Sequence, residues 1–165
     1  MDLNLITSYD ATPEEVFAII TDVTFQEQVF QRFSARSYDV AVRDAGDDVL
    51  LRVQWETAPD DLPVVSRRLV GEMLSLVQTK IWHRAGHDGA REAHIEGELA
   101  GARVKLTGRT VLVPTGRSTT QEFDLHVTAS TPVLGPRLER VVTDAVRTRL
   151  EAKFEVAWSW LAGSL

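Results

Sequence analysis

The sequence predicts an α+β fold in which an antiparallel β-sheet of about seven strands is covered by one long C-terminal helix. Three observations lead to this prediction. Apolar and polar residues alternate in several segments between residues 36 and 127, as in strands with one buried face. Two short helical patterns follow the first alternating segment. The last part of the chain has a helical period without internal glycine or proline.

Composition places the chain among globular proteins. Its 165 residues, 44% of them hydrophobic, match the size and core content of one domain, so we expect a single domain over 1–165. The absence of cysteine excludes disulfides, thiolate metal ligands and cysteine nucleophiles. A net charge of -6 argues against nucleic-acid partners and against binding to anionic membranes.

Targeting signals and membrane spans are not expected. Asp2 follows the first methionine, where a secretory signal would carry positive charge. Apolar stretches are much shorter than the ~20 residues that cross a bilayer, so we expect no integral membrane association. A cytoplasmic location is the resulting expectation.

The first elements have clear start signals. Residues 2–10 alternate and predict a strand. Thr12, Pro13 and Glu15 then form a capping box with proline in the first helical turn, which predicts a helix that ends near Asp22. A second short helix is predicted by apolar residues that recur every four positions: Phe25, Val29 and Phe33.

The central segments predict antiparallel strands. Residues 36–43 and 49–57 alternate on either side of the turn 44–48, which is typical of a hairpin. Pro63 predicts a short helix that ends at Gly71. Residues 73–83 are predicted to be extended with an open register, because Leu74, Leu76 and Trp82 on one face compete with Met73, Val77 and Ile81 on the other.

Three further strands complete the predicted sheet. A short strand is expected near 91–97, a well-alternating one over 103–113, and a last one around 123–127. Gly108 lies in the middle of its strand on the apolar side, where it would permit a sharp bend or the close approach of another group. Pro136 then predicts the start of the long helix, which ends at about Leu161.

The order of these elements resembles the helix-grip fold of the START-like (SRPBCC) superfamily, which includes birch-pollen-allergen-like and polyketide-cyclase/lipid-transport proteins. The segments that carry the resemblance are YDATPEEVFAIITD after the opening strand and GPRLERVVTDAVRTRLEAKFEVAWSWL at the end. The middle, LPVVSRRLVGEMLSLVQTKIW, is similar to a branch of unassigned function from high-GC Gram-positive bacteria. The resemblance covers essentially the whole chain. It implies a curved sheet wrapped around the C-terminal helix, with a cavity that usually holds an apolar small molecule or lipid.

The helical stripe and the inward strand faces supply the candidate ligand-binding residues. Arg149 falls near the middle of the apolar stripe of the long helix, with Lys153 close to it. It either anchors a ligand carboxylate, phosphate or carbonyl, or it is a structural residue that pairs with Glu72 or Glu96 or extends its charge to solvent. The predicted set is Leu51, Val53, Trp55, Leu106, Phe123, Leu125, Val142, Ala145 and Arg149.

Three functions compete at this level. The first is binding or transport of a hydrophobic small molecule or lipid. The second is an enzyme of the cyclase, aromatase or dehydratase kind that uses the same cavity, with no catalytic residue assigned. The third is a protein-interaction module with a filled core and a contact surface around Phe154 and Trp158.

Signatures of cofactor and metal chemistry are missing from the sequence. It contains no nucleophile elbow, no phosphate-binding loop and no dinucleotide fingerprint. His83 and His87 have HxxxH spacing, but they lie where a strand enters a glycine-flanked turn, and not on one helix. We therefore expect no metal and no cofactor.

Overall fold

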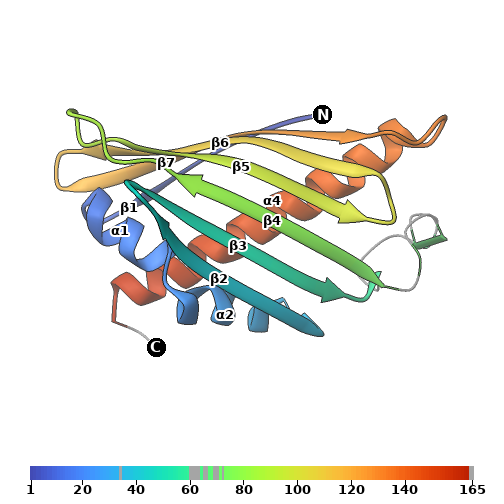
Figure 1. The fold of residues 1–165 in the computed structure, drawn as a ribbon, viewed down its shortest axis with the longest axis horizontal. Helices are drawn as coiled ribbons and strands as arrows, with labels where there is room; N and C mark the ends of the chain where they lie inside the picture. Colours follow the sequence, from blue (N-terminus) through green and yellow to red (C-terminus); the bar gives the residue numbers. More distant parts are fainter. Residues whose placement is uncertain (34, 60–63, 65–66, 69–70, 72, 164–165) are drawn as a thin grey trace.

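A computed structural model describes residues 1–33, 35–59, 64, 67–68, 71 and 73–163 of the chain. Its elements in chain order are β1 (Asp2–Tyr9), α1 (Pro13–Ile20), α2 (Val23–Arg32), β2 (Ser37–Ala45), β3 (Asp48–Thr57), β4 (Leu74–Trp82), β5 (Arg91–Ala100), β6 (Val104–Thr115), β7 (Ser118–Ala129) and α4 (Gly135–Leu161). The seven strands form one sheet in the order β1-β7-β6-β5-β4-β3-β2, and all neighbours are antiparallel. Figure 1 shows α4 crossing one face of this sheet diagonally, with α1 and α2 beside its C-terminal half. The predicted α+β helix-grip fold is confirmed.

The strands differ from the prediction mainly in length. β5 extends to Ala100 and β7 begins at Ser118, whereas alternation alone predicted shorter strands there. Ladder pairing with neighbours continues past the alternating segments, because backbone hydrogen bonds do not require an apolar side chain at every second position. The short helix predicted from Pro63 to Gly71 falls largely outside the described residues.

Both short helices begin at the predicted signals. The Glu15 N–H donates to Thr12 Oγ1 at 3.3 Å, and the Thr12 N–H donates to a Glu15 carboxylate oxygen at 2.8 Å, which completes the capping box. Asp22 caps α2 in the same manner by accepting a hydrogen bond from the Phe25 N–H at 3.0 Å. The two caps satisfy backbone donors where the chain turns from β1 toward the sheet face.

Pairing with β3 and β5 decides the register of β4. Leu74, Lys80 and Trp82 are buried on the inner face, while Met73 and Ile81 are exposed. The two faces of this segment carry similar apolar residues, so the alternation could not choose between them. The observed register buries the large indole of Trp82, and it also buries a lysine that no apolar pattern selects.

The interior is divided into four apolar clusters that lie between the sheet and the helices. Leu138 and Val142, near the start of α4, pack against the strands that flank the β5–β6 turn. Phe154 is 5% exposed, and its ring lies 5.7 Å from that of Phe123. The contact surface predicted around Phe154 and Trp158 therefore does not include Phe154, because the sheet covers more of α4 than one narrow stripe. Trp158 stays 47% exposed.

Polar contacts fix both ends of α4. The indole N–H of Trp160 donates to the Gln28 side chain at 2.7 Å, and that of Trp158 donates to the Ser8 carbonyl at 2.9 Å. These bonds tie the last turns of α4 to α2 and β1.

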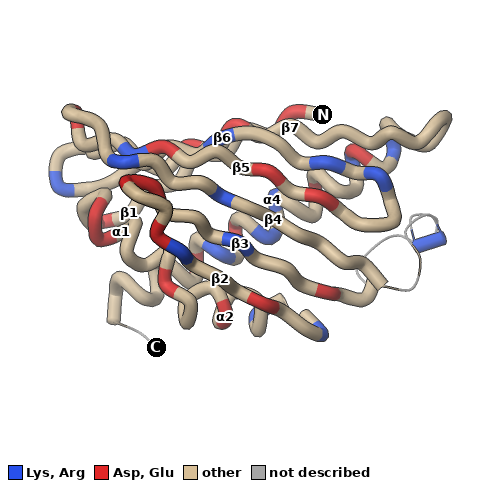
Figure 2. The backbone as a smooth tube through the Cα atoms, viewed as in Figure 1, with Lys and Arg blue, Asp and Glu red and all other residues tan. Residues whose placement is uncertain are grey.

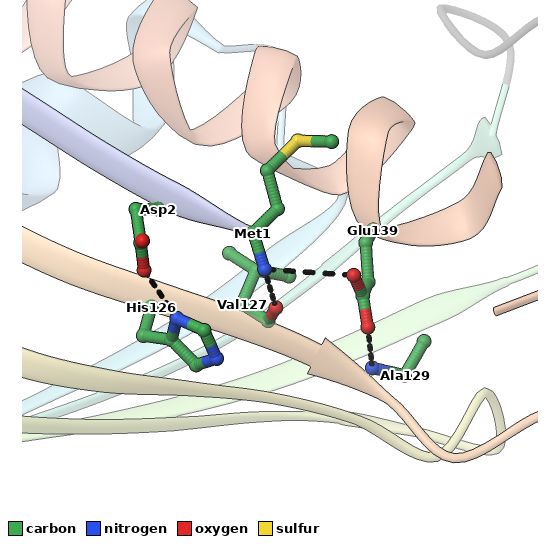
Figure 3. Close-up of polar contacts among 6 residues, drawn as sticks. All are labelled: Met1, Asp2, His126, Val127, Ala129 and Glu139. Atoms are coloured by element: carbon green, nitrogen blue, oxygen red, sulfur yellow. Dashed lines mark hydrogen bonds and ion pairs between the residues drawn. The ribbon is translucent and has the colours of Figure 1, made fainter. Parts of the chain in front are cut away.

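The start of the chain is tied to the other end of α4 (Figure 3). The Met1 amino group donates to the Val127 carbonyl at 2.6 Å and lies 3.5 Å from Glu139, whose other oxygen accepts from the Ala129 N–H at 3.0 Å. The hydrogen bond from Ala129 is the main cause that lowers the pKa of Glu139. This contact links β1, β7 and α4.

Charged residues are spread over the outer surface. Figure 2 shows acidic and basic positions interspersed along the strands and helices. On the outer face of the sheet, for example, Arg109 lies 3.8 Å from both Glu92 and Asp124, which come from neighbouring strands. None of the described helices combines the length and the apolar character that a membrane crossing requires.

Gly108 is a point of close backbone approach between β6 and β7. Its φ is 153°, and a Cβ at this position would lie 2.1 Å from the Asp124 carbonyl oxygen and 2.8 Å from the Leu125 Cα. Backbone atoms cannot move away without disrupting the ladder, so only glycine fits. The predicted close approach is confirmed, and the partner is the neighbouring strand.

We predict that Gly108→Ala destabilises the fold by about 3 kcal/mol or more, because the added methyl group overlaps backbone atoms. Gly101→Ala is the matched control: its φ of 86° strains an alanine, but a Cβ there has open space around it. We expect the control to lose about 1 kcal/mol. Urea denaturation measures the free energy of unfolding of both variants. Equal losses would show that the close approach of β6 and β7 is not what makes Gly108→Ala destabilising.

Candidate functional site

A cavity of about 120 Å³ lies between the inner face of the sheet, α2 and α4. Its walls are mostly apolar and include Phe30, Val53, Leu106, Val142 and Val146. Each of the surrounding apolar clusters contributes to one side of the space, and the cavity occupies the middle where the clusters do not meet.

Residue size explains why this space is hollow. Gly97 lies on the inner face of β5 between Gln78 of β4 and Leu106 of β6, so a central position of the sheet has no side chain. A Cβ on Gly97 would contact the Leu106 side chain at 3.4 Å and the Val77 carbonyl oxygen at 3.6 Å, so a side chain could enter the space above the sheet, and glycine leaves that space open. Across the cavity α4 presents the short side chains of Val142 and Val146, which pack against the apolar clusters on either side of it.

The structure brings five of the nine predicted ligand-binding residues to the cavity wall: Val53, Trp55, Leu106, Val142 and Arg149. The other four lie elsewhere. Leu51 packs with Phe30 and Val53, and Phe123 and Leu125 pack with Phe154 beneath α4. Ala145 is half-buried on α4 and does not line the cavity, because the lining positions of the helix are offset from the predicted stripe.

Two lysines enter the cavity from opposite walls. Lys80 comes from the middle of β4 and is 5% exposed, and Lys153 comes from α4. Their side chains interact directly with each other. Aromatic rings lie near both ammonium groups: Lys80 Nζ is 6.0 Å from the Phe123 ring centroid and Lys153 Nζ is 5.8 Å from that of Phe25. These distances are at the outer limit of a cation–π contact.

The surroundings of the lysines disfavour their charged forms. Burial lowers the pKa of Lys80 from 10.5 to about 8. Burial and then the charge of Lys80 hold the pKa of Lys153 well below its ordinary value. Among the described residues, no carboxylate forms an ion pair with either lysine. The cavity therefore contains two amines whose charged forms are disfavoured, and Lys80 changes its charge near pH 8.

Arg149 also lines the cavity, as predicted. Its guanidinium carbon lies 5.1 Å from the Trp55 ring centroid and 5.6 Å from that of Phe33. Of its two predicted carboxylate partners, Glu96 points to the outer face of β5 with a side chain that is 72% exposed, and Glu72 lies outside the described residues. Arg149 adds a third basic group to the same wall as Lys153.

Sequence reasoning missed Lys80, and it noted Lys153 without counting it among the ligand-binding residues. A signal was present in the composition, because the chain has three lysines against 15 arginines. The alternation of β4 also placed Lys80 on the same face as Trp82, although the choice of face was open. Arg149 was found because its helix has one clear stripe.

Comparisons with known proteins agree with the fold. A profile of the family described as "Protein of unknown function (DUF2505)" matches residues 4–161. No curated protein matches the chain. Three solved structures resemble it over nearly its whole length. TTHA0849 from Thermus thermophilus is 14% identical, with a TM-score of 0.65 and 99% of each chain covered.

The other two structures have equally low identity. A STAR-related lipid transfer protein from Xanthomonas axonopodis is 15% identical, with a TM-score of 0.64 and coverage of 98% of this chain and 85% of that one. The Zhui aromatase/cyclase from Streptomyces sp. R1128 is 9% identical, with a TM-score of 0.64 and coverage of 98% and 93%. At such identities the likeness shows that the fold is shared and gives no information about activity.

We predict that Lys80→Met stabilises the protein at pH 7 by about 1–3 kcal/mol, because it removes an amine whose charged form is disfavoured. The folded pKa is about 8 and the unfolded value 10.5, so between these pH values the folded state binds fewer protons. The loss of folding stability caused by the buried Lys80 ammonium is therefore present in full below pH 8, and it disappears as the pH rises toward 10.5.

Urea denaturation at pH 7 and pH 10 tests the predicted direction of this pH dependence. The advantage of Lys80→Met over the wild type should shrink at pH 10, while Lys105→Met, at an exposed position, should match the wild type at both pH values. A Lys80→Met protein that is less stable at pH 7 would contradict the prediction.

Proposed function

We propose that this chain, which belongs to the DUF2505 family, binds a hydrophobic small molecule in the cavity between its sheet and α4. The observation that carries the proposal is the cavity itself, with apolar walls and a few polar groups. Small-molecule sites usually have this composition, since apolar walls supply affinity and a few polar groups orient the ligand. The helix-grip fold, which solved structures named as a lipid transfer protein and an aromatase/cyclase share, supports the same choice.

The volume limits the size of the ligand. The cavity measures about 120 Å³. A dry apolar cavity of roughly 150 Å³ accommodates benzene. The ligand that fits without rearrangement is therefore one aromatic ring or a short acyl chain, and a larger lipid would need α2 or α4 to move.

A cyclase-type enzyme that uses the same cavity is the second candidate. Lys153 favours it, because a buried amine with a lowered pKa can act as a general base. Against it, no carboxylate side chain from the described residues faces into the cavity: Glu98 borders it, but strand alternation directs its exposed side chain to the outer face. A protein-interaction module with a filled core is disfavoured by the cavity.

Native mass spectrometry of freshly purified protein, followed by organic extraction, tests whether a small molecule is bound. We expect a complex with a ligand of one ring or a short chain. A protein that has no extractable ligand, and that also fails to bind both 4-ethylbenzyl alcohol and hexan-1-ol in calorimetric titrations, would contradict the proposal.

We predict that Val142→Phe lowers the affinity for 4-ethylbenzyl alcohol by about 10-fold or more, since the added ring fills the space where the ligand lies. Ile6→Phe is the matched control, because it adds the same ring at a position that is 70% exposed on β1. Isothermal titration calorimetry measures both variants. Unchanged binding by a folded Val142→Phe protein would place the ligand elsewhere.

A further inference from the structure

The distribution of lysines in this chain is unusual. Of 18 basic residues, three are lysines, and two of these three converge on the cavity. The third, Lys105, is exposed on the outer face of β6. Nearly all basic positions on the surface are therefore arginines, and lysine is concentrated where a ligand would lie.

The chemical difference between the two residues gives this distribution a meaning. A guanidinium stays charged at any pH that a protein experiences, whereas an ammonium group can release its proton when it is buried. A buried charge without a counter-ion is costly. Lysine can therefore be neutral in the empty cavity and charged in a filled one, provided that the ligand brings a negative charge.

The groups that face the two lysines do not supply that charge. On the sheet, Lys80 lies between Leu51 of β3 and Ile95 of β5 and near the ring of Phe123 of β7. From α2 they face Gln26 and Phe25, and Gln26 donates its amide to the Ile20 carbonyl. Among the described residues, Arg149 of α4 is the third charged side chain that faces the cavity, and it is positive as well.

Building on the proposed function, we propose that the ligand is a hydrophobic acid whose anionic group lies between the ammonium groups of Lys80 and Lys153. Its apolar part then lies against Val53, Leu106 and Val142. Charge-assisted hydrogen bonds from two ammonium groups satisfy a carboxylate in an otherwise apolar site. The ligand in turn supplies the counter-charge that the described part of the chain does not place beside the lysines.

Binding of such an acid is coupled to proton uptake. The bound carboxylate favours the ammonium form, so a neutral amine in the empty cavity takes one proton from solvent as the anion enters. No covalent bond forms or breaks. The lowered pKa of both lysines supports this step, because above pH 8 Lys80 is mainly neutral in the empty protein and the pKa of Lys153 is lowered in the same direction. The affinity for the acid therefore falls as the pH rises above 8.

Paired probes of equal shape test the proposal. Isothermal titration calorimetry at pH 7 compares 4-ethylbenzoate with 4-ethylbenzyl alcohol, and hexanoate with hexan-1-ol. In the wild type we expect each fitting acid to bind about 10-fold or more tightly than its alcohol. Lys80→Met and Lys153→Met should remove most of this preference, because they weaken acid binding far more than alcohol binding, while Lys105→Met should change neither.

A second readout measures the protons. Titrations of the acid at pH 8.5 in phosphate and in Tris, whose ionisation enthalpies differ, should show net proton uptake by the wild type and less by each methionine variant. Both variants are expected to fold, since methionine suits the apolar surroundings. Lys153→Arg should retain the preference for acids but take up fewer protons, because arginine is already charged.

Three outcomes would overturn the proposal, and they are distinguishable. If alcohols bind as tightly as acids, the inference about the anion fails and the proposed function stands. If acids are preferred equally by the wild type and both methionine variants, the anion lies elsewhere and the lysine pair is structural. If none of the four probes binds and organic extraction yields no ligand, both the inference and the proposed function fail.

Discussion

The packing of α4 against the concave face of the sheet is the constraint on which the rest of the structure depends. The helix contacts β1 and β7 along one side and α2 along the other. Both of its ends are held by hydrogen bonds, one accepted by Glu139 and two donated by Trp158 and Trp160. Between these attachments a cavity lies between α4 and strands β3 to β6. Gly97 has no side chain and the facing side chains of α4 are short, so this middle region stays unfilled. The cavity is therefore a result of how the helix packs on the sheet.

The chemistry of the cavity follows from two positions on opposite walls. The register of β4 turns Lys80 inward, and the helical spacing of α4 brings Lys153 to face it. Most proteins exclude unpaired buried amines, because the charged form loses its hydration. Their presence in an apolar space gives a cavity whose charge can change, which a purely hydrophobic cavity cannot do.

Much of the fold could be predicted from local patterns, and the site only in part. The capping box at Thr12 and the hairpin around residues 44–48 depend on neighbouring residues, and both were found. Arg149 was found because its helix has a single apolar stripe. Lys80 was missed because both faces of β4 are apolar, and Phe154 was misplaced because the curved sheet covers α4 widely.

The amino-acid sequence by itself determined the order of elements, their caps and turns, and the inward residues of strands whose two faces differ. These features depend on interactions between residues close together in the chain, which a pattern of polarity records. Only the tertiary structure decided which face of β4 is buried, how far α4 is enclosed and where the interior stays empty. Those outcomes depend on pairing and volume between segments far apart in sequence, and no local period encodes them.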